Sequence, residues 1–330
     1  MSKVRAWLQL FRVPNLLTVP GDPLAGFLLA SGGRLDERAV APLIACLCLY
    51  AAGLVLNDLA DHKEDARERP NRPLPSGAVS RGAAVLISGN LIIFGLGLCI
   101  IAGPPVALMG FGLLLGIFLY DFFTKKIAVV GALNMGVCRG LSVLVGAAAG
   151  IGPDLSMIST GLALEPLSPA LALPFYALAS IGHRLFVFAL AAALIIAVYI
   201  AAVTNLARYE TQPAYPKFPR WLPLAAIFFG YIILKQGTGS LFRDPSPTTW
   251  VIAIFMGAAL TSQLMKDPPP PLPPRIGGFI RILPVMQAAL CVAPSVAGRM
   301  PKTAESLICA GVLLACVPLH AWLAKKFYAS

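Results

Sequence analysis

The apolar run APLIACLCLYAAGLVL at Ala41–Leu56 passes directly into the charged stretch NDLADHKEDARERPNR at Asn57–Arg72. The first segment has the character of a helix that crosses a bilayer, which takes about 20 mostly apolar residues. The second holds five of the fifteen acidic side chains of the chain. Because charge at the mouth of a membrane helix is costly, this cluster indicates a functional site.

The composition excludes an ordinary soluble protein. The chain has 330 residues, of which 58% are hydrophobic and 12% charged, and its mean hydropathy is +0.78. Since soluble domains are about 25% charged, we expect an all-α polytopic membrane protein with a single membrane domain over residues 1–330. The expected spans are Asn15–Ala30, Ala41–Leu56, Ala83–Ala102, Pro105–Tyr120, Ala128–Gly150, Leu185–Leu206, Trp221–Ile233, Trp250–Leu264 and Ser306–Leu323. A weaker run, Ile276–Val292, makes the count nine or ten.

The basic residues predict the orientation. If the N-terminus lies inside, the inside segments carry fifteen Lys and Arg. The outside segments carry six, namely Arg34, Arg38, Arg184, Arg243, Arg299 and Lys302. By the positive-inside rule, we expect a multi-pass protein of the cell (inner) membrane with its N-terminus and charged stretch in the cytoplasm. The net charge of +11 is spread over several loops, so it does not indicate a nucleic-acid partner.

The spacing of the acidic residues favours a metal site. Asp58, Asp61 and Asp65 are three and four residues apart, so they share one face with Asn57 if the helix continues for two turns. Carboxylates at a helix C-terminus are disfavoured by the helix dipole and by one another, and a cation relieves both penalties. Asp and Asn oxygens suit Mg²⁺, which phosphates of a substrate often help to coordinate.

Arginines follow the aspartates. Arg67, Arg69 and Arg72 carry planar guanidinium groups that match phosphate oxygens. Acidic residues for a metal, followed by arginines for phosphates, are a layout suited to ionising a diphosphate. The alternative is a solvated charged loop held by internal salt bridges.

The pattern N-D-x-x-D-x-x-x-D, followed by R-P-x-R-P-L-P-S-G, resembles the first aspartate-rich motif of the UbiA superfamily of intramembrane prenyltransferases. The resemblance implies a bundle of about nine transmembrane helices around a central chamber. It implies Mg²⁺-dependent transfer of a prenyl group from a prenyl diphosphate to an aromatic or other small acceptor. It also implies that Asn57, Asp58, Asp61 and Asp65 hold the metal, that the three aspartates are catalytic, and that Arg69 and Arg72 bind substrate.

Further stretches are similar to the same family. In YDFFTKK, the resemblance implies that Tyr120, together with Lys125 or Lys126, binds the diphosphate. The segments FRVPNLLTVPGDPLAG and GALNMGVCRGLSVLVGA resemble family spans and place four more residues at the substrate chamber, which are Asn15, Asp22, Asn134 and Arg139. An arginine within a span is expected to face a cavity or an acidic partner. The N…D…G pattern of the first of these segments, the NMGVCRGLS stretch and a later T-x-x-x-R-x-E pattern are together most similar to the EboC-like branch.

One stretch departs from the family pattern. A second acidic motif is expected after the sixth span, but this chain has VTNLARYETQ, with Thr204, Arg208 and Glu210 as the candidate substrate-binding residues. One hypothesis is that Arg208 replaces a second metal in neutralising charge. The other is that the chain has lost ionisation chemistry and serves as a membrane transporter or export component for a lipid-like or aromatic metabolite. The sequence identifies neither the acceptor nor the oligomeric state.

Overall fold

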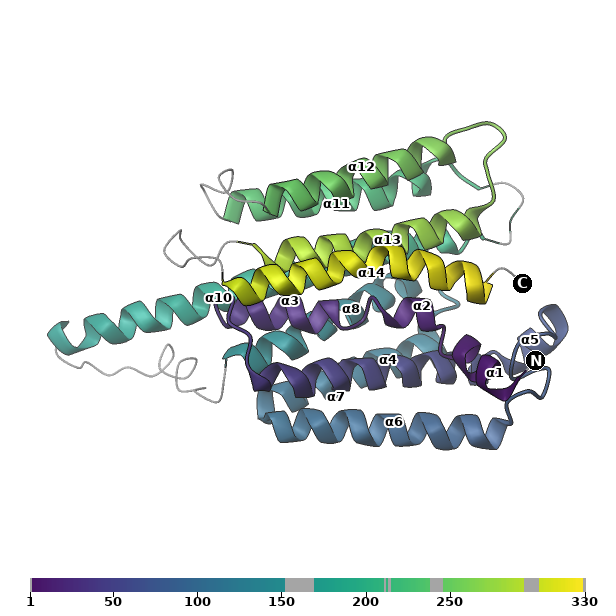
Figure 1. The fold of residues 1–330 in the computed structure, drawn as a ribbon, viewed down its shortest axis with the longest axis horizontal. Coiled ribbons are helices and arrows are strands. Elements are labelled where there is room, and N and C mark those ends of the chain that lie inside the picture. Colours follow the sequence, from purple (N-terminus) through teal and green to yellow (C-terminus); the bar gives the residue numbers. More distant parts are fainter. Residues whose placement is uncertain are drawn as a thin grey trace.

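The computed structural model of the chain describes residues 2–151, 169–210, 212, 215–237, 246–293 and 303–328. Within these ranges every regular element is a helix and no strand occurs. The long helices run roughly parallel or antiparallel to one another (Figure 1). The expectation of an all-α protein is therefore confirmed.

The helices follow one another along the chain in two groups. The first half contains α1 (Lys3–Leu10), α2 (Val13–Leu16), α3 (Gly21–Ala30), the 3-10 turn η1 (Glu37–Ala39), α4 (Val40–Ala60), α5 (His62–Glu68), α6 (Arg81–Ala102), α7 (Pro104–Leu119), the π-helical turn η2 (Tyr120–Thr124) and α8 (Ala128–Ile151). The second half contains α10 (Pro169–Ala207), α11 (Phe218–Gly237), α12 (Ser246–Leu264), α13 (Leu272–Cys291) and α14 (Ala304–Tyr328).

Six helical segments of the described chain are long and apolar enough to cross a membrane. They are Glu37–Ala60, Arg81–Ala102, Pro104–Thr124, Ala128–Ile151, Val187–Ala207 and Ala304–Phe327. Two shorter apolar segments, Phe218–Ile233 and Thr249–Leu264, lie in α11 and α12. The chain is thus a multi-pass membrane protein, whereas the count of nine or ten spans stays a prediction.

The first expected span, Asn15–Ala30, is interrupted, so the prediction of one continuous helix was wrong. Helix α2 ends at Leu16 and α3 begins at Gly21. The cause is Pro20, which has no N–H to donate and disfavours helical geometry at the residue before it. The break frees the backbone carbonyl of Thr18, which becomes an acceptor for side chains of two other helices.

Helix α6 has an exposed apolar surface. Large apolar side chains along it are exposed, among them Leu86, Ile93 and Ile101. Exposed apolar surface of this extent on a folded protein marks a surface that contacts another apolar phase. In a multi-pass membrane protein that phase is the hydrocarbon core of the bilayer.

Close helix packing places α3 against α8. Gly26 and Gly146 stand at the contact, and an added Cβ would collide with the backbone carbonyl of Val143 at the first and of Pro23 at the second. Small residues let membrane helices approach to backbone contact, which gains dispersion energy. This close approach brings Asp22 of α3 and Arg139 of α8 together in the bundle interior.

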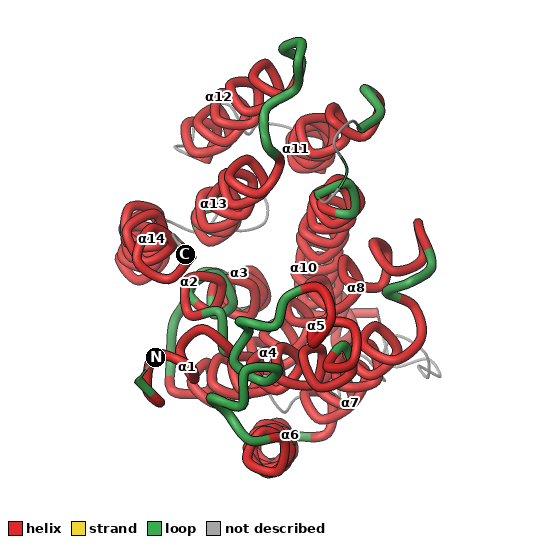
Figure 2. The backbone as a smooth tube through the Cα atoms, turned by 90° about the vertical axis from the view of Figure 1, so that its right-hand side faces the viewer, coloured by secondary structure: helices red, strands yellow, loops and turns green. Residues whose placement is uncertain are grey.

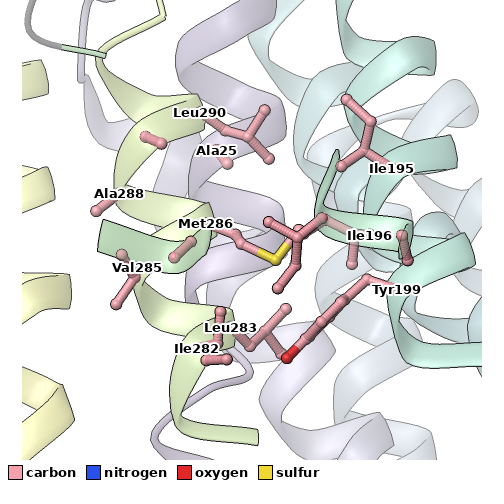
Figure 3. Close-up of a cluster of buried hydrophobic side chains, with 14 of the residues drawn as sticks. Ala25, Ile195, Ile196, Tyr199, Ile282, Leu283, Val285, Met286, Ala288 and Leu290 are labelled. Carbon is pink, nitrogen blue, oxygen red and sulfur yellow. The ribbon is translucent and has the colours of Figure 1, made fainter. Parts of the chain in front are cut away.

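A buried apolar cluster joins the two halves of the chain. Ala25 of α3, Ile196 and Tyr199 of α10, and Met286 of α13 pack together there (Figure 3). The hydroxyl of Tyr199 donates to the carbonyl of Phe279 over 2.6 Å, which satisfies its buried oxygen. The second half therefore packs directly against α3 and α8 of the first half.

Both chain ends and the charged stretch lie at one end of the bundle. Figure 1 places the N-terminus, the C-terminus, α1 and α5 together, and Figure 2 views the molecule from this side. This arrangement agrees with a single inside face for these segments. Of the residues predicted outside, Arg243, Arg299 and Lys302 lie beyond the described ranges.

Candidate functional site

The acidic motif sits at a bend between two helices. Helix α4 ends at Ala60 and α5 begins at His62, so Asp61 is the junction residue. Asp58 belongs to the last turn of α4, and Asp65 lies in α5, with both carboxylates buried. The continuation of the helix predicted from the sequence occurs, but it is not straight.

Asp58 and Asp65 share one arginine. Nη1 of Arg72 lies 2.6 Å from Oδ2 of Asp65 and 4.0 Å from Oδ1 of Asp58. That Asp58 oxygen also accepts a hydrogen bond of 2.8 Å from Nη2 of Arg12, 46 residues earlier in the chain. The structure therefore brings Asp58, Asp65 and Arg72 together as the sequence predicts, and Arg12 joins them.

Asp61 faces a different element. Nζ of Lys125, directly after η2, lies 2.5 Å from Oδ1 of Asp61 and 3.4 Å from Oδ1 of Asn57. Lys126 is exposed and lies 3.4 Å from Glu64. Of the two lysines that the sequence left as alternatives, Lys125 is thus the one joined to the motif.

The donor set fits Mg²⁺ in its chemistry, because the three aspartates and Asn57 offer the hard oxygens that this ion prefers. The spacing predicts that the three aspartates share one helix face, but in the structure they point to two places. Asp58 and Asp65 face Arg72, whereas Asp61 faces Lys125. Across the described ranges, no group of three or more Asp, Glu, His or Cys side chains is arranged to hold a metal ion. Basic side chains balance the carboxylate charge here.

A large cavity opens beside the motif, and we call it the arginine pocket. Its volume is about 710 Å³. It is lined by Arg5, Gln9, Arg12, Asp58, Glu68, Arg69, Pro70, Asn71, Arg72, Pro73 and Phe327. Four arginines face two carboxylates in this lining, so the cavity has an excess of positive charge. Such a surface is suited to phosphate groups.

A smaller cavity of about 150 Å³ extends from the motif into the bundle, and we call it the inner pocket. It is lined by Arg12, Val19, Cys46, Tyr50, Gly53, Leu54, Asn57, Leu113, Ile117, Tyr120, Asp121, Met135, Cys138, Arg139 and Ser142. Arg12 belongs to the linings of both pockets. Tyr120, which the sequence assigned to the diphosphate, lines the inner pocket rather than the arginine pocket.

Arg139 occupies a buried polar network behind the inner pocket. Its Nε lies 2.7 Å from Oδ2 of Asp22, and its Nη2 donates to the carbonyl of Thr18 over 2.8 Å. Gln287 of α13 donates to the same carbonyl over 2.8 Å and to Oδ1 of Asp22 over 2.6 Å. Arg139 therefore has both features expected of an arginine within a span, since it lines a cavity and pairs with an acidic side chain.

Two other predicted residues hold local structure. The amide of Asn134 donates to the carbonyl of Gly116 over 3.2 Å and to Oγ1 of Thr124 over 2.9 Å, which ties α8 to the end of α7. The backbone carbonyl of Asn15 accepts a hydrogen bond of 2.8 Å from the hydroxyl of Thr18. Neither Asn134 nor Asn15 belongs to the lining of either pocket.

The residues of the degenerate second motif lie at the end of α10 and directly after it. Arg208 and Glu210 are exposed, and Thr204 is half-buried. These three line neither pocket, and within the described part of the chain no hydrogen bond or ion pair joins them to the acidic motif. A role for Arg208 in place of a second metal stays a prediction.

Sequence motifs do not point to three residues that the structure adds. Arg5 of α1 lines the arginine pocket. The only sequence feature that could have indicated this role is its position on a basic amphipathic segment. Gln287 is an amide within the apolar run ILPVMQAALC, which is itself a sign of a buried polar partner. Ser142 lies in a run of small residues and carries no such signal.

A profile of the UbiA prenyltransferase family matches residues 23–181. Curated relatives include the digeranylgeranylglyceryl phosphate synthases of Methanocaldococcus jannaschii and Methanopyrus kandleri. The first is 31% identical over 153 residues, which cover 46% of this chain and 53% of that protein. The second is 34% identical over 152 residues, which cover 46% of this chain and 55% of that protein. The chain thus spans about half the length of these relatives.

Solved structures share the fold over most of the chain. A UbiA homologue from Aeropyrum pernix K1 has a TM-score of 0.63 at 15% identity, covering 84% of this chain and 97% of that one. A structure described as a digeranylgeranylglyceryl phosphate synthase in membranes has a TM-score of 0.55 at 20% identity, and the match covers 89% of this chain and 99% of that one. At these identities the likeness establishes a UbiA-like fold and nothing further. Assignment to the EboC-like branch stays a prediction.

Proposed function

Because the UbiA prenyltransferase family profile matches residues 23–181, we propose that the chain belongs to this family and transfers a prenyl group from a prenyl diphosphate to an aromatic or other small acceptor. The observation that carries this proposal is the joining of Asp61, Asn57 and Lys125 beside a cavity rich in arginine. The name of the curated relatives supports prenyl chemistry, since it describes a product with two geranylgeranyl groups.

The arginine pocket is where we place the diphosphate. Arg69 and Arg72 line it and follow the acidic motif, and Arg12 reaches it from the N-terminal segment. As the bond between carbon and the bridging oxygen breaks, negative charge grows on the leaving diphosphate. Positive groups already fixed around that position stabilise the charge without having to reorganise.

Lys125 is the cation that we assign to the inward side of the diphosphate. Its ammonium group is largely buried, with 13% of the side chain exposed, and Asp61 and Asn57 hold it in place. A diphosphate that approaches the motif would meet this ammonium group opposite the arginines. Tyr120 lies one π-helical turn before it, where its ring lines the passage into the inner pocket.

Asp58, Asp61 and Asp65, with Asn57, are the residues that would hold Mg²⁺. When bound, the ion would neutralise diphosphate charge and stabilise the leaving group. For the aspartates to take this role, their ion pairs with Arg12, Arg72 and Lys125 would have to open. Those basic groups would then be free to move from the carboxylates to the phosphate oxygens.

The bundle itself supplies protection from water. The prenyl tail is apolar, and we propose that it lies between helices with side access from the lipid. An allylic cation formed beside the motif would be flanked by apolar side chains such as Leu54 and Ile117 of the inner pocket. Exclusion of water lets an acceptor, rather than solvent, capture the cation.

The proposal treats residues 1–330 as one domain in the cell (inner) membrane. The clustering of the chain ends, α1 and α5 at one end of the bundle supports a shared cytoplasmic face. The basic segments that favour this orientation lie at that same end. A prenyl diphosphate, which is charged, would then reach the motif from the cytoplasm while its tail enters from the membrane.

The test is Mg²⁺-dependent diphosphate release by the purified protein, with allylic diphosphates of increasing length and a set of acceptors. We expect release by the wild type and a loss of at least about a hundredfold in Asp61→Ala. Asp36→Ala is the matched control, because Asp36 forms an exposed ion pair with Arg38 outside both pockets. Absence of release with every chain length and acceptor, while the protein still binds the diphosphate, would refute the proposal.

One observation favours a second function, transport of a lipid-like or aromatic metabolite without catalysis. The residues of the degenerate motif, Thr204, Arg208 and Glu210, line neither pocket, and in the described part of the chain no ion pair or hydrogen bond joins them to the aspartates. Reconstituted vesicles distinguish the two functions. Transport predicts movement of labelled lipid diphosphate across the bilayer with the molecule intact, whereas catalysis predicts its cleavage.

A further inference from the structure

Helix α14 carries a buried histidine without a hydrogen-bonding partner. His320 is 2% exposed, and neither Nδ1 nor Nε2 of its ring forms a hydrogen bond with any described residue. A neutral imidazole has one N–H donor and one acceptor, so two hydrogen-bonding positions stay open. Because buried polar atoms nearly always have a partner, these open positions need an explanation.

His320 lies on the side of α14 that packs on the bundle. The buried residues Ser306, Cys309, Leu313 and His320 recur at spacings of three, four and seven, which places them on one helix face. Cys309 and Leu313 belong to the apolar cluster that also contains much of α13. Helix α13 packs beside α14 (Figures 1 and 2). The imidazole is therefore turned toward α13 and away from the outer face of α14.

Arg281 of α13 is the cation beside this histidine, close enough for its charge to act on the ring. Its Nε donates to the carbonyl of Gly277 over 3.1 Å, and the side chain is half-buried. Within the described part of the chain no carboxylate pairs with it. Helix α13 contains no acidic residue, and the one in α14, Glu305, lies at the far end. An arginine at membrane depth ordinarily faces an anionic partner.

The two residues lie at a similar depth in the bundle. His320 comes eight residues before Tyr328 and Arg281 nine residues after Leu272, and these two helix ends lie at the same end of the bundle (Figure 1). At 1.5 Å per residue, the distances from those ends are about 12 Å and about 14 Å. Exposed Lys326 is about 9 Å beyond His320, where its ammonium group is suited to the level of the lipid head groups. The pair thus lies just inside the leaflet that borders the chain ends.

The chemistry of the pair suits an oxyanion attached to an apolar chain. A guanidinium group donates two parallel hydrogen bonds to a phosphate, and the N–H of an imidazole can donate a third. Leu319 and Trp322, next to His320 in the sequence, are exposed and give an acyl chain an apolar surface. A free phosphate ion would have to leave its hydration shell to enter here. Basic sites between membrane helices near the cytoplasmic face are suited to anionic head groups.

We propose that Arg281 and His320 bind the phosphate of one anionic phospholipid at the boundary between α13 and α14. The guanidinium of Arg281 and the N–H of His320 donate to the phosphate oxygens, while the acyl chains follow the outer face of α14. Neither residue lines the arginine pocket or the inner pocket. The site is thus separate from the acidic motif, and the inference does not rest on the proposed function.

The test is native mass spectrometry of the delipidated protein, titrated with dioleoylphosphatidylglycerol. We expect saturable binding of one lipid molecule, and binding of dioleoylphosphatidylcholine that is weaker by at least about tenfold, because its head group has no net negative charge. Inorganic phosphate and a prenyl diphosphate should not displace the lipid. Equal binding of phosphatidylcholine would overturn the assignment. Displacement by inorganic phosphate would indicate a site for a free anion, and displacement by the prenyl diphosphate would indicate part of the substrate chamber; either result would also overturn it.

Variants locate the site. Arg281→Gln should weaken phosphatidylglycerol binding by about ten- to a hundredfold and His320→Leu by about tenfold, the range for hydrogen bonds to a charged group. Arg281→Lys keeps the charge without the planar fork, so it should retain part of the affinity. Arg81→Gln is the matched control, since Arg81 is exposed at the start of α6 and lines neither pocket. Unchanged binding in Arg281→Gln and His320→Leu, or an equal loss in Arg81→Gln, would refute the site.

Thermal unfolding separates lipid binding from a purely structural role of His320. Without lipid, the Tm of His320→Leu should not fall, because no hydrogen bond to another residue is lost. Phosphatidylglycerol should raise the Tm of the wild type, since a ligand that binds the folded state stabilises it. The same lipid should raise the Tm of His320→Leu much less. A lower Tm without lipid, together with an undiminished rise on adding lipid, would assign His320 to packing alone and contradict the proposal.

Discussion

The ammonium nitrogen of Lys125 lies 2.5 Å from Oδ1 of Asp61, across 64 residues of sequence. The contact joins the loop after η2 to the junction of α4 and α5. The contact places the ammonium group of Lys125 at Asp61, the residue that separates α4 from α5. The neighbouring Lys126 reaches only Glu64, at 3.4 Å on the exposed side. Two adjacent lysines therefore have separate environments, and their variants should differ.

Lys125→Ala should lower kcat/KM for an allylic diphosphate by on the order of ten- to a hundredfold. A charge-assisted hydrogen bond contributes about 1.5–3 kcal/mol, and this one would act on the charge of the diphosphate. Steady-state diphosphate release measures the effect. Lys126→Ala is the control and should stay within about twofold of wild type. Equal losses in both variants would contradict a specific role for Lys125.

Arg72→Ala should reduce both the affinity for a prenyl diphosphate and the rate of its cleavage, because Arg72 pairs with Asp65 and approaches Asp58. Arg72→Lys keeps the charge but loses the planar fork, so it should recover only part of the affinity. Calorimetric titration with a non-cleavable prenyl diphosphate analogue measures this. Arg67→Ala is the control, since Arg67 is exposed and lines neither pocket. Full recovery by lysine would contradict bidentate recognition.

Asp22→Leu should destabilise the protein strongly, because it leaves Arg139 buried without its acidic partner. Removing one member of a buried ion pair costs about 3–5 kcal/mol. The double variant Asp22→Leu/Arg139→Met should regain much of the lost Tm, since it removes both charges. Asp36→Asn, at an exposed pair, should change stability by less than about 1 kcal/mol. Thermal unfolding in detergent measures all three, and a double variant worse than the single one would contradict the pairing.

A cysteine placed at Lys126 should react with a membrane-impermeant maleimide only from the cytoplasmic side. One placed at Arg34, in the exposed turn between α3 and η1, should react only from the opposite side. These expectations follow from the excess of basic residues in the inside segments. Labelling of intact cells and of inverted vesicles, each compared with the unsubstituted protein, measures the orientation. Reaction of both positions from the same side would contradict the topology.

Run length and composition sufficed to predict an all-helical membrane bundle, because about 20 apolar residues have few alternatives to a spanning helix. The break in the first span was harder to foresee. Proline is tolerated within membrane helices when neighbouring groups satisfy the freed carbonyl. Arg139 and Gln287, which come from distant parts of the chain, donate to the carbonyl of Thr18 within the break, and no local pattern foretells these two bonds.

The site was predictable only in part. Spacing brings Asp58 and Asp65 to one side, and the following loop brings Arg72 to them, since all of these contacts are local. The ion pair of Lys125 with Asp61 joins residues 64 positions apart in the sequence, and that of Arg12 with Asp58 joins residues 46 positions apart. Both pairs depend on how the helices pack. No local pattern encodes such contacts.

Positional isotope exchange tests the central claim most directly, because it reports ionisation without needing the acceptor. An allylic diphosphate is prepared with ¹⁸O at the oxygen that bridges carbon and phosphorus, and the purified protein is added with Mg²⁺. If the motif ionises the substrate, the label moves into non-bridging positions of recovered diphosphate ester, and Asp61→Ala abolishes this movement. If substrates of every chain length bind but keep their label in place, the chain does not perform prenyl transfer chemistry.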